Sequence, residues 1–304
     1  MMLWGIDLGG TKIEGVILDP AHPGHPLTRM RVPTESERGY DHIVERVRTL
    51  VEQMEAGSGL PRPALIGIGT PGAVGPATGL MKNCNTVCLN ARPLRRDLCA
   101  ALGAEVSIAN DANCFALAEA TFGAARGCAV VAGLIIGTGV GSGIVVHGRV
   151  LEGLHGIAGE WGHNPMRDEE AVCYCGRKGC VETVIAGPSL ERFYRERTGE
   201  ALCLPDITVR ADRGEAAGRA TLDRLRDKFG EAIAALINIL DPNIIVIGGG
   251  VGNIAALYDD ETRRAVQRHL FNSELRTEFV KPILGDSAGV FGAALLVAPI
   301  TPSV

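Results

Sequence analysis

One histidine and three cysteines fall close together between residues 158 and 183. His163 lies ten residues before Cys173, and Cys173, Cys175 and Cys180 form a Cys-x-Cys-x4-Cys run. One imidazole and three thiolates are a ligand set suited to tetrahedral zinc. Because such a set leaves no open position for water or substrate, we expect a structural zinc rather than a catalytic one. The alternative is that the thiols are unrelated or form a disulfide pair.

A glycine turn with an acidic residue follows the first apolar segment. Leu3–Leu8 is typical of a strand, and Asp7-Leu8-Gly9-Gly10-Thr11-Lys12 leads into a second apolar run, Ile13–Leu18. No helix follows the glycines, as it would in a P-loop, so the pattern favours a β-hairpin whose amide groups bind phosphate. The carboxylate of Asp7 could hold a magnesium ion or its waters. A plain hairpin turn with an incidental acid is the alternative.

The same pattern recurs in the second half of the chain. Ala129–Ile136 is typical of a strand, residues 137–143 are a glycine-rich turn, and Ile144–His147 is a returning strand. Two such units predict a duplicated nucleotide clamp with phosphate-binding amides in each half. Further on, the buried strand Ile244–Ile247 ends in Gly248-Gly249-Gly250. These glycines leave room for an adenine ring, or else they form a close-packed corner between strand and helix.

A carboxylate and several amides lie at other strand ends. Val106–Ala109 is a predicted strand, and Asp111 follows it before a helix expected over 114–123. Ligands of α/β proteins bind at this kind of strand end, although Asp is also a common helix N-cap. We expect Asn113 to cap the helix, which leaves Asp111 free for chemistry. The loop that contains Asn83 offers amides to sugar-like hydroxyls, and a solvated turn would look similar.

The composition describes a globular protein. Its 304 residues, 46% of them hydrophobic, are enough for about two domains. A formal net charge of -5 disfavours a general nucleic-acid-binding protein. Nine cysteines without a signal-peptide pattern fit a reducing compartment, and no apolar run is long enough to span a bilayer, so we expect a cytoplasmic protein. Residues 198–215 are polar and yield no prediction.

In this order and combination, the motifs resemble the bacterial sugar kinases of the ROK family (repressors, open reading frames, kinases) over essentially the whole chain. The matching stretches are Gly5–Lys12, Gly137–Gly141, Gly159–His163 with the cysteine run and Glu182, and Asp241–Gly250. The resemblance implies the duplicated actin-like ATPase (ribonuclease H-like) α/β fold, with two domains flanking an active-site cleft. We expect a small domain of residues 1–115 plus about 287–304, and a large domain of residues 116–286.

The resemblance also implies an activity, the transfer of the γ-phosphoryl group of ATP to the 6-hydroxyl of a hexose. Asp111 would be the general base, with catalytic Mg²⁺, structural Zn²⁺ and a homodimer, and with neither nucleic acid nor membrane as a partner. The implied sugar ligands are Asn83, Asn110, Asp111, Glu160, His163 and Glu182. The implied nucleotide ligands are Gly5, Ile6, Asp7, Leu8, Gly9, Gly10, Thr11, Lys12, Gly137, Thr138, Gly139, Val140, Gly141, Ser142, Gly143, Ile144, Gly249 and Gly250.

The choice of sugar depends on the finer resemblance. The segment Glu160–Pro165 and the loop Lys82–Asn90 are most similar to the family's fructokinases, which also accept mannose. The stretch Asn110–Leu117 is shared almost letter for letter with its N-acetylglucosamine kinases. We therefore expect fructose, with N-acetylglucosamine or glucose as the alternative. A sugar-responsive repressor is disfavoured because the first strand begins at Leu3, without a preceding helix-turn-helix, and Asp111 with both phosphate turns disfavours an inactive sugar-binding module.

Overall fold

The computed structural model describes residues 2–22 and 24–299 of the chain. The chain divides into two compact units, the first formed by residues up to 127, 143–158 and from 283 onward, and the second by residues 128–142 and 159–282. The predicted boundaries at 115/116 and 286/287 differ from this division, because α3 (Asp111–Thr121) stays whole and packs against α10 (Ala288–Leu295) in the first unit. As functional domains, the predicted boundaries stay a prediction.

The first unit is built on a five-stranded sheet of order β3-β2-β1-β4-β7. Strands β1, β2 and β3 are antiparallel neighbours, and β4 and β7 continue the sheet in parallel with β1. The strands are β1 (Leu3–Leu8), β2 (Lys12–Leu18), β3 (Thr28–Pro33), β4 (Leu65–Thr70) and β7 (Glu105–Asn110). A small hairpin joins β5 (Ala73–Val74) and β6 (Met81–Lys82).

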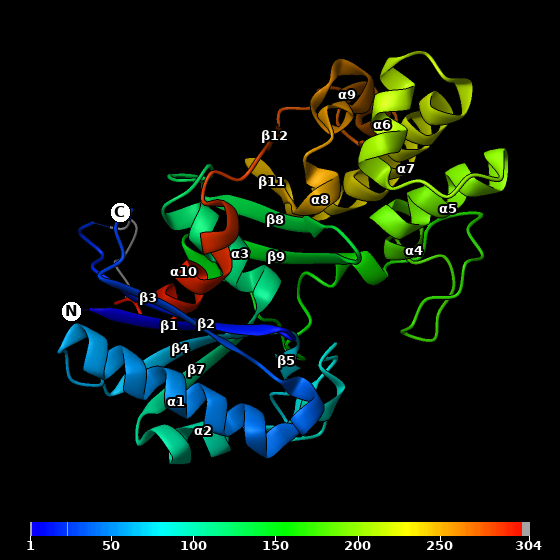
Figure 1. Cartoon of the computed structure of the whole chain (residues 1–304). Helices are drawn as coiled ribbons and strands as arrows, with labels where there is room; N and C mark the ends of the chain where they lie inside the picture. Colours follow the sequence, from blue (N-terminus) through cyan, green and yellow to red (C-terminus); the bar gives the residue numbers. More distant parts are fainter. Residues whose placement is uncertain (1, 23, 300–304) are drawn as a thin grey trace. The chain divides into compact units, whose positions relative to one another are not determined.

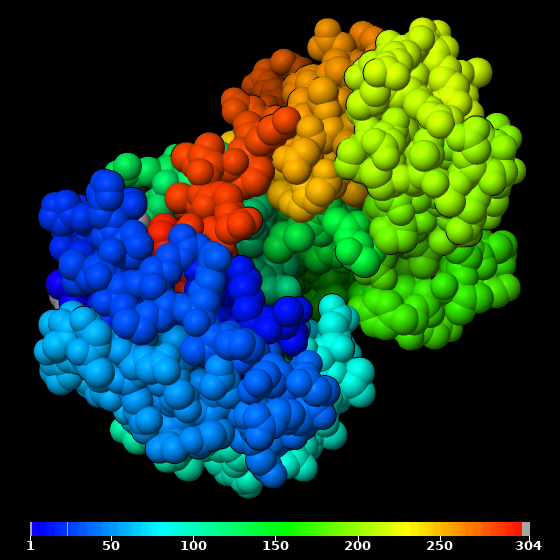
Figure 2. Space-filling view, viewed as in Figure 1, coloured from blue at the N-terminus to red at the C-terminus, as the bar shows by residue number. Residues whose placement is uncertain are grey.

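Helices cover both faces of this sheet (Figure 1). α1 (Tyr40–Ser58) packs on β2 and β3, and α2 (Leu94–Leu102) packs on β7. α10 and α3 lie on the other face, where α10 packs on β1, β2 and β4. The apolar residues of α1 recur every three or four positions, as expected for a helix with one buried face. The outer side of α1 forms a continuous light-blue surface in Figure 2. Short 3-10 turns are η1 (Ser36–Arg38), η2 (Val87–Leu89) and η5 (Gly285–Ser287).

The second sheet has the order β10-β9-β8-β11-β12, which repeats the topology of the first. Its strands are β8 (Val130–Ile136), β9 (Val140–Val146), β10 (Arg149–Val150), β11 (Ile244–Gly248) and β12 (Glu278–Val280). β9 begins in the second unit and runs on into residues of the first. It also begins four residues earlier than the sequence predicted, because glycines 141 and 143 lie in the strand rather than in the turn. The repeat confirms the predicted duplicated α/β fold.

The helices of the second unit pack around one buried apolar core, with α5, α6 and α7 drawn in yellow-green in Figure 1. They are α4 (Glu182–Ile185), α5 (Gly187–Thr198), α6 (Leu204–Asp212), α7 (Ala216–Leu240), α8 (Gly249–Gly252) and α9 (Asp260–Gln267). Two 3-10 turns, η3 (Trp161–His163) and η4 (Ala255–Tyr258), complete the unit. Within residues 2–22 and 24–299, no helix is both long and apolar enough to cross a membrane.

The contact between α10 and α3 gives a stability prediction. A methyl group added at Gly292 of α10 would overlap the backbone carbonyl of Cys114 on α3, and α10 is also packed against β1 and β4. Gly292→Ala should therefore lower the free energy of unfolding by about 3 kcal/mol, although alanine is the better helix former. Calorimetry should show a fall of several degrees in Tm. Gly57→Ala in α1 is the control, since its methyl group would meet only the flexible tip of Met30; an equal fall in both variants would contradict the prediction.

Candidate active site

The first phosphate turn forms the hairpin expected from the sequence. β1 and β2 pair antiparallel, and Gly9 N–H donates to the carbonyl of Lys12 at 3.0 Å. The buried Thr34 holds the turn from behind, with its hydroxyl 2.6 Å from the carbonyl of Gly9 and its amide 2.9 Å from that of Thr11. Gly10 and Thr11 remain exposed at the tip. Their amides and hydroxyl are therefore accessible to an anion, as phosphate binding requires.

Asp7 and Asp111 are neighbouring carboxylates in the first unit. Burial, together with the charges of Asp111 and Glu14, raises the pKa of Asp7 to about 6, and Lys12 opposes the shift. The Asp7 carboxylate lies against Gly69 and Gly289, where a side chain would crowd it. Carboxylate oxygens are the ligands that Mg²⁺ prefers, and bound Mg²⁺ would also relieve the repulsion between the two acids. Asp7 therefore fits a magnesium-binding role.

Asp111 is the first residue of α3, and Asn110 caps the helix. The Asn110 side chain accepts the amide of Asn113 at 2.8 Å, so the prediction that Asn113 is the cap was wrong. Asp111 does not cap the helix: it is exposed, and its Oδ1 accepts the amide of Ala112 at 2.8 Å. Its role in the chemistry stays a prediction. Crowding by protein atoms raises the pKa of Asp111, against the effect of that amide. A carboxylate that is open to solvent on one side and has a raised pKa suits a general base.

The loop with Asn83 is held by a different amide. Asn90 accepts the amide of Cys84 at 2.9 Å and donates to its carbonyl at 3.0 Å, so Asn90 fixes the loop. Asn83 is exposed, with a left-handed backbone at φ 56°. Left-handed φ is costly for most residues but is tolerated by asparagine. The loop therefore presents the Asn83 side chain outward, as a sugar ligand would require.

The second unit contains the four predicted metal ligands. The ligand atoms of His163, Cys173, Cys175 and Cys180 all lie within 4.8 Å of one another. Cys175 Sγ is 3.6 Å from Cys180 Sγ, and Cys173 Sγ is 3.6 Å from His163 Nδ1. A zinc tetrahedron with bonds of about 2.3 Å has edges of about 3.8 Å, so the spacing fits zinc. All nine cysteines are free, which excludes the disulfide alternative in this structure.

Glycines and neighbouring contacts fix residues 160–182, the segment that carries these four candidate ligands and is called the metal loop below. Gly176 and Gly179 have φ of 85° and 67°, values that glycine adopts without strain and that let the loop reverse tightly. The indole N–H of Trp161 donates to the carbonyl of Ala232 on α7 at 3.0 Å. Glu169 forms an ion pair with Arg224 of the same helix at 2.8 Å. The loop is thus attached to the longest helix of the unit.

The acidic residues of the loop have different surroundings. Glu182 Oε2 accepts the amide of Val140 at 3.0 Å, and Glu182 Oε1 lies 3.8 Å from Cys173 Sγ. Glu182 therefore connects the metal loop with the second phosphate turn, a link that the sequence did not reveal. Glu160 Oε2 lies 4.0 Å from His163 Nε2. The same nitrogen is 3.0 Å from the hydroxyl of Tyr174, a residue that the sequence did not single out. Burial of the phenol oxygen and the charges of Glu182 and Glu160 raise the pKa of Tyr174 to about 12.

A cavity of about 690 Å³ adjoins the second phosphate turn within the second unit. Gly137 and Thr138 border it, together with α5, α6 and the segment 250–255. Gly250 would meet no atom within 4 Å if it carried a methyl group, whereas a methyl group on Gly249, whose φ is 81°, would overlap the carbonyl of Ile136. Gly249 therefore forms the close-packed corner that was the alternative, whereas Gly250 leaves open space beside the cavity. The placement of adenine there stays a prediction.

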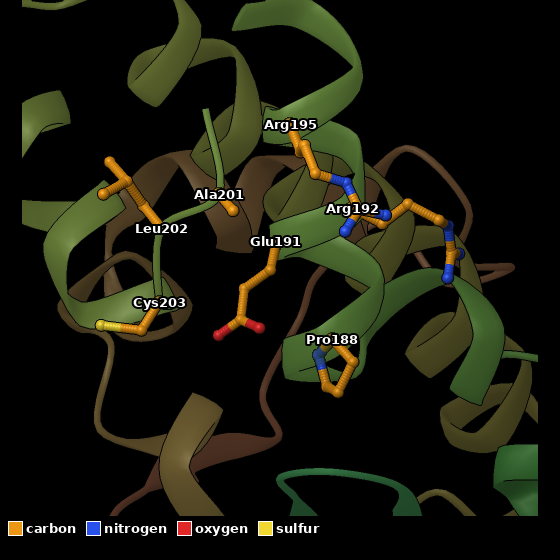
Figure 3. Close-up of a pocket in the computed structure, with 7 residues that line it drawn as sticks. All are labelled: Pro188, Glu191, Arg192, Arg195, Ala201, Leu202 and Cys203. Atoms are coloured by element: carbon orange, nitrogen blue, oxygen red, sulfur yellow. The ribbon is translucent and has the colours of Figure 1, made fainter. Parts of the chain in front are cut away.

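A smaller cavity of about 490 Å³ shares Pro188 and Glu191 with the first (Figure 3). Figure 3 shows Glu191 projecting from α5 toward the segment before α6, with Arg192 and Arg195 on the same helix. Glu191 Oε1 accepts the amide of Leu204 at 2.8 Å. This hydrogen bond holds the start of α6 against α5. The helix α6, for which the sequence yielded no prediction, thus forms a wall of the larger cavity.

The comparisons with known proteins agree with this geometry. Residues 3–299 match the model of the ROK family. An N-acetyl-D-glucosamine kinase of Pectobacterium atrosepticum is 36% identical, over 97% of this chain and 98% of that protein. A ROK hexokinase structure from Thermus thermophilus has a TM-score of 0.86 and 34% identity, with 97% of each chain covered. A ROK glucokinase from Streptomyces griseus, in complex with glucose and AMPPNP, has a TM-score of 0.76 and 26% identity over 97% of this chain and 98% of that one.

The chain belongs to the ROK family and is an ATP-dependent sugar kinase with the actin-like ATPase fold. The expected class of protein is thereby confirmed. The expected preference for fructose finds no support, because similar proteins of Pectobacterium atrosepticum and Photobacterium profundum are named N-acetyl-D-glucosamine kinases, which matches the alternative. The motifs around Glu160 and Asn83 were too short to separate the sugar preferences of one family.

Proposed function

We propose that the protein transfers the γ-phosphoryl group of ATP to the 6-hydroxyl of N-acetyl-D-glucosamine. The observation that carries the proposal is the 36% identity, over nearly the full length of both chains, to a kinase named for that sugar. The free carboxylate at the start of α3 and the accessible phosphate turns support the phosphoryl-transfer chemistry. Fructose and glucose remain the competing substrates.

Asp111 is the proposed general base. A sugar hydroxyl is a weak nucleophile near pH 7, and a carboxylate that accepts its proton typically accelerates the reaction by about 10²- to 10⁴-fold. Asn110 retains its side-chain NH₂ group for a sugar oxygen, since its Oδ1 caps α3. Amides of Gly10, Thr11 and Thr138 are proposed to bind phosphate oxygens, and Asp7 to hold Mg²⁺, which neutralises charge on the transferred group.

Zinc is proposed to be structural. With His163, Cys173, Cys175 and Cys180 as ligands, no coordination position is left for substrate. The metal would set the ring angle of His163 and the position of Glu182, and so shape the sugar site from outside the chemistry. Glu160 and His163 are proposed to bind sugar hydroxyls.

A coupled assay of ADP release tests the proposal. N-acetylglucosamine should give the highest kcat/KM among N-acetylglucosamine, glucose, fructose, mannose and N-acetylmannosamine. A tenfold or greater preference for fructose would restore the fructokinase interpretation. ADP release with none of the five sugars would reject the proposed function.

The cavity of about 690 Å³ beside Gly137 and Thr138 is proposed to bind the nucleoside part of ATP, which gives a separate prediction. Glu191→Ala removes both a wall of the cavity and the acceptor of the Leu204 amide, a charge-assisted hydrogen bond. The KM for ATP should rise about tenfold while the KM for sugar changes less than twofold. Glu196→Ala is the matched control, because Glu196 is exposed on the same helix and does not line the cavity. An equal rise for ATP and sugar would argue against a local role in nucleotide binding.

A further inference from the structure

The hydroxyl of Tyr174 is the hydrogen-bond partner of His163 Nε2, the imidazole nitrogen that faces away from the thiols. The two atoms are 3.0 Å apart, and the rings meet edge to face with centroids 5.2 Å apart. The same Nε2 lies 4.0 Å from Glu160. The phenol therefore sits where the proposed sugar ligands His163 and Glu160 converge.

The metal loop fixes which His163 nitrogen is a donor. Nδ1 lies 3.6 Å from Cys173 Sγ and so faces the ligand cluster. A neutral imidazole that gives the lone pair of Nδ1 to a metal keeps its proton on Nε2. Nε2–H then donates to the oxygen of Tyr174. One N–H group has one strong acceptor, so a sugar hydroxyl at this nitrogen must replace the phenol.

Tyr174 can move without disrupting the protein core. Tyr174 is 69% exposed, so few packing contacts hold its ring in place. Cys173 and Cys175, on either side of it, are both among the four predicted ligands, so metal binding would anchor the backbone while the side chain rotates. A well-anchored residue with a loosely packed ring suits a group that alternates between two positions.

We propose that Tyr174 is a specificity residue. Its hydroxyl accepts the hydrogen bond of His163 Nε2 when no sugar hydroxyl does so, and this broadens the range of sugars that the site binds. The inference rests on the proposed sugar-binding role of His163. A site that leaves a polar group unpaired strongly rejects a sugar that lacks the matching hydroxyl. With Tyr174 present, His163 keeps its hydrogen bond when such a sugar binds. The phenol therefore weakens the binding of a sugar that carries the hydroxyl facing His163. It also reduces the loss of affinity for a sugar that lacks this hydroxyl.

Titration calorimetry of the zinc-loaded protein without ATP tests the idea. N-acetylglucosamine is compared with its 1-, 3- and 4-deoxy analogues, in wild type and in Tyr174→Phe. The variant should bind N-acetylglucosamine about 2- to 10-fold more tightly, the factor associated with one neutral hydrogen bond. The preference for the complete sugar over one of the analogues should grow by a similar factor, and the other two preferences should stay unchanged.

Two further variants separate this role from loosening of the loop. Tyr174→Leu also lacks the hydroxyl and should reproduce the shift, with zinc content and Tm unchanged. Val172→Thr changes another exposed residue of the loop and should leave all four affinities as in wild type. Preferences that are unchanged at every position, or affinity lost equally for all sugars, would overturn the inference. If wild type binds none of these sugars, it is the proposed function that fails.

Discussion

Asp111→Asn is expected to lower kcat by about 10²- to 10⁴-fold while the Kd for sugar changes only a few-fold. The amide keeps the size of the side chain and can still accept the Ala112 N–H, but it cannot take a proton from the sugar hydroxyl. The substitution also removes a negative charge that raises the pKa of Asp7, so Tm should not fall. Rapid quench of a single turnover, with calorimetry for sugar binding, separates the two effects. Retention of more than about a tenth of kcat would exclude Asp111 as the base.

Asp7→Asn is the informative companion variant, because it removes the neighbouring carboxylate with a different expected signature. Asp7 is proposed to hold Mg²⁺, so its loss should raise the magnesium concentration needed for half-maximal rate. Asp111→Asn should leave that concentration unchanged. If both variants shifted the magnesium dependence equally, the assignment of separate roles would be wrong.

The pH dependence of kcat/KM for the sugar gives an independent check on the base. Asp111 acts in its ionised form, so the rate should fall as pH decreases. Because crowding raises the pKa of this carboxyl, the midpoint of the fall should lie above the ordinary aspartate value of about 4. A profile from pH 4.5 to 8 measures this midpoint. The fall in rate at low pH should be absent from the residual activity of Asp111→Asn. If the fall persisted in this variant, it would reflect the titration of another group.

The sequence predicted the parts of this protein that depend on local pattern. The hairpin at Gly9 and Gly10 and the clustering of the four candidate metal ligands both follow from spacing and residue type. The repeat of the strand and glycine-turn pattern predicted the two strand–turn–strand units, whereas the duplicated fold was implied by the family resemblance and the strand order came from the structure. The features predicted from local pattern need no knowledge of distant contacts.

Other features depended on tertiary context or on a signal that was missed. Both Asn110 and Asn113 are suitable caps by type, and only the extended backbone of Asn110, with ψ 162°, decides between them. The roles of Gly249 and Gly250 differ because only Gly249 packs against β8. The helix α6 could have been found, since Pro205 lies in its first turn and Leu204, Ile207 and Ala211 recur at helical spacing on its buried side. The contact of Tyr174 with His163 has no counterpart in the sequence pattern.

Removal of zinc should weaken sugar binding and protein stability together. Trp161 and Glu169 attach the metal loop to α7, and Glu182 attaches it to the second phosphate turn. Backbone hydrogen bonds fold the loop between these points, and a metal held by the four ligands would cross-link it. Without the metal, three thiols would lose their common partner and His163 would lose its fixed tautomer. We expect the Kd for sugar to rise about 10- to 100-fold and Tm to fall by several degrees. The Kd for a non-hydrolysable ATP analogue should change less, because most of the proposed nucleotide cavity is lined by α5, α6 and the segment 250–255.

Cys175→Ala is the test that avoids chelators, since Cys175 is the exposed ligand and its loss leaves no cavity in the core. Metal analysis should find about one zinc per wild-type chain and much less in the variant. Cys203→Ala is the matched control, because Cys203 is an exposed thiol of the same unit outside the ligand cluster, and it should change neither zinc content nor sugar affinity. A zinc-free protein with lowered Tm but unchanged sugar affinity would show that the metal stabilises the fold without shaping the sugar site. Joint loss of both would mean that the same four bonds that close the loop also hold His163 and Glu182 in position for the sugar.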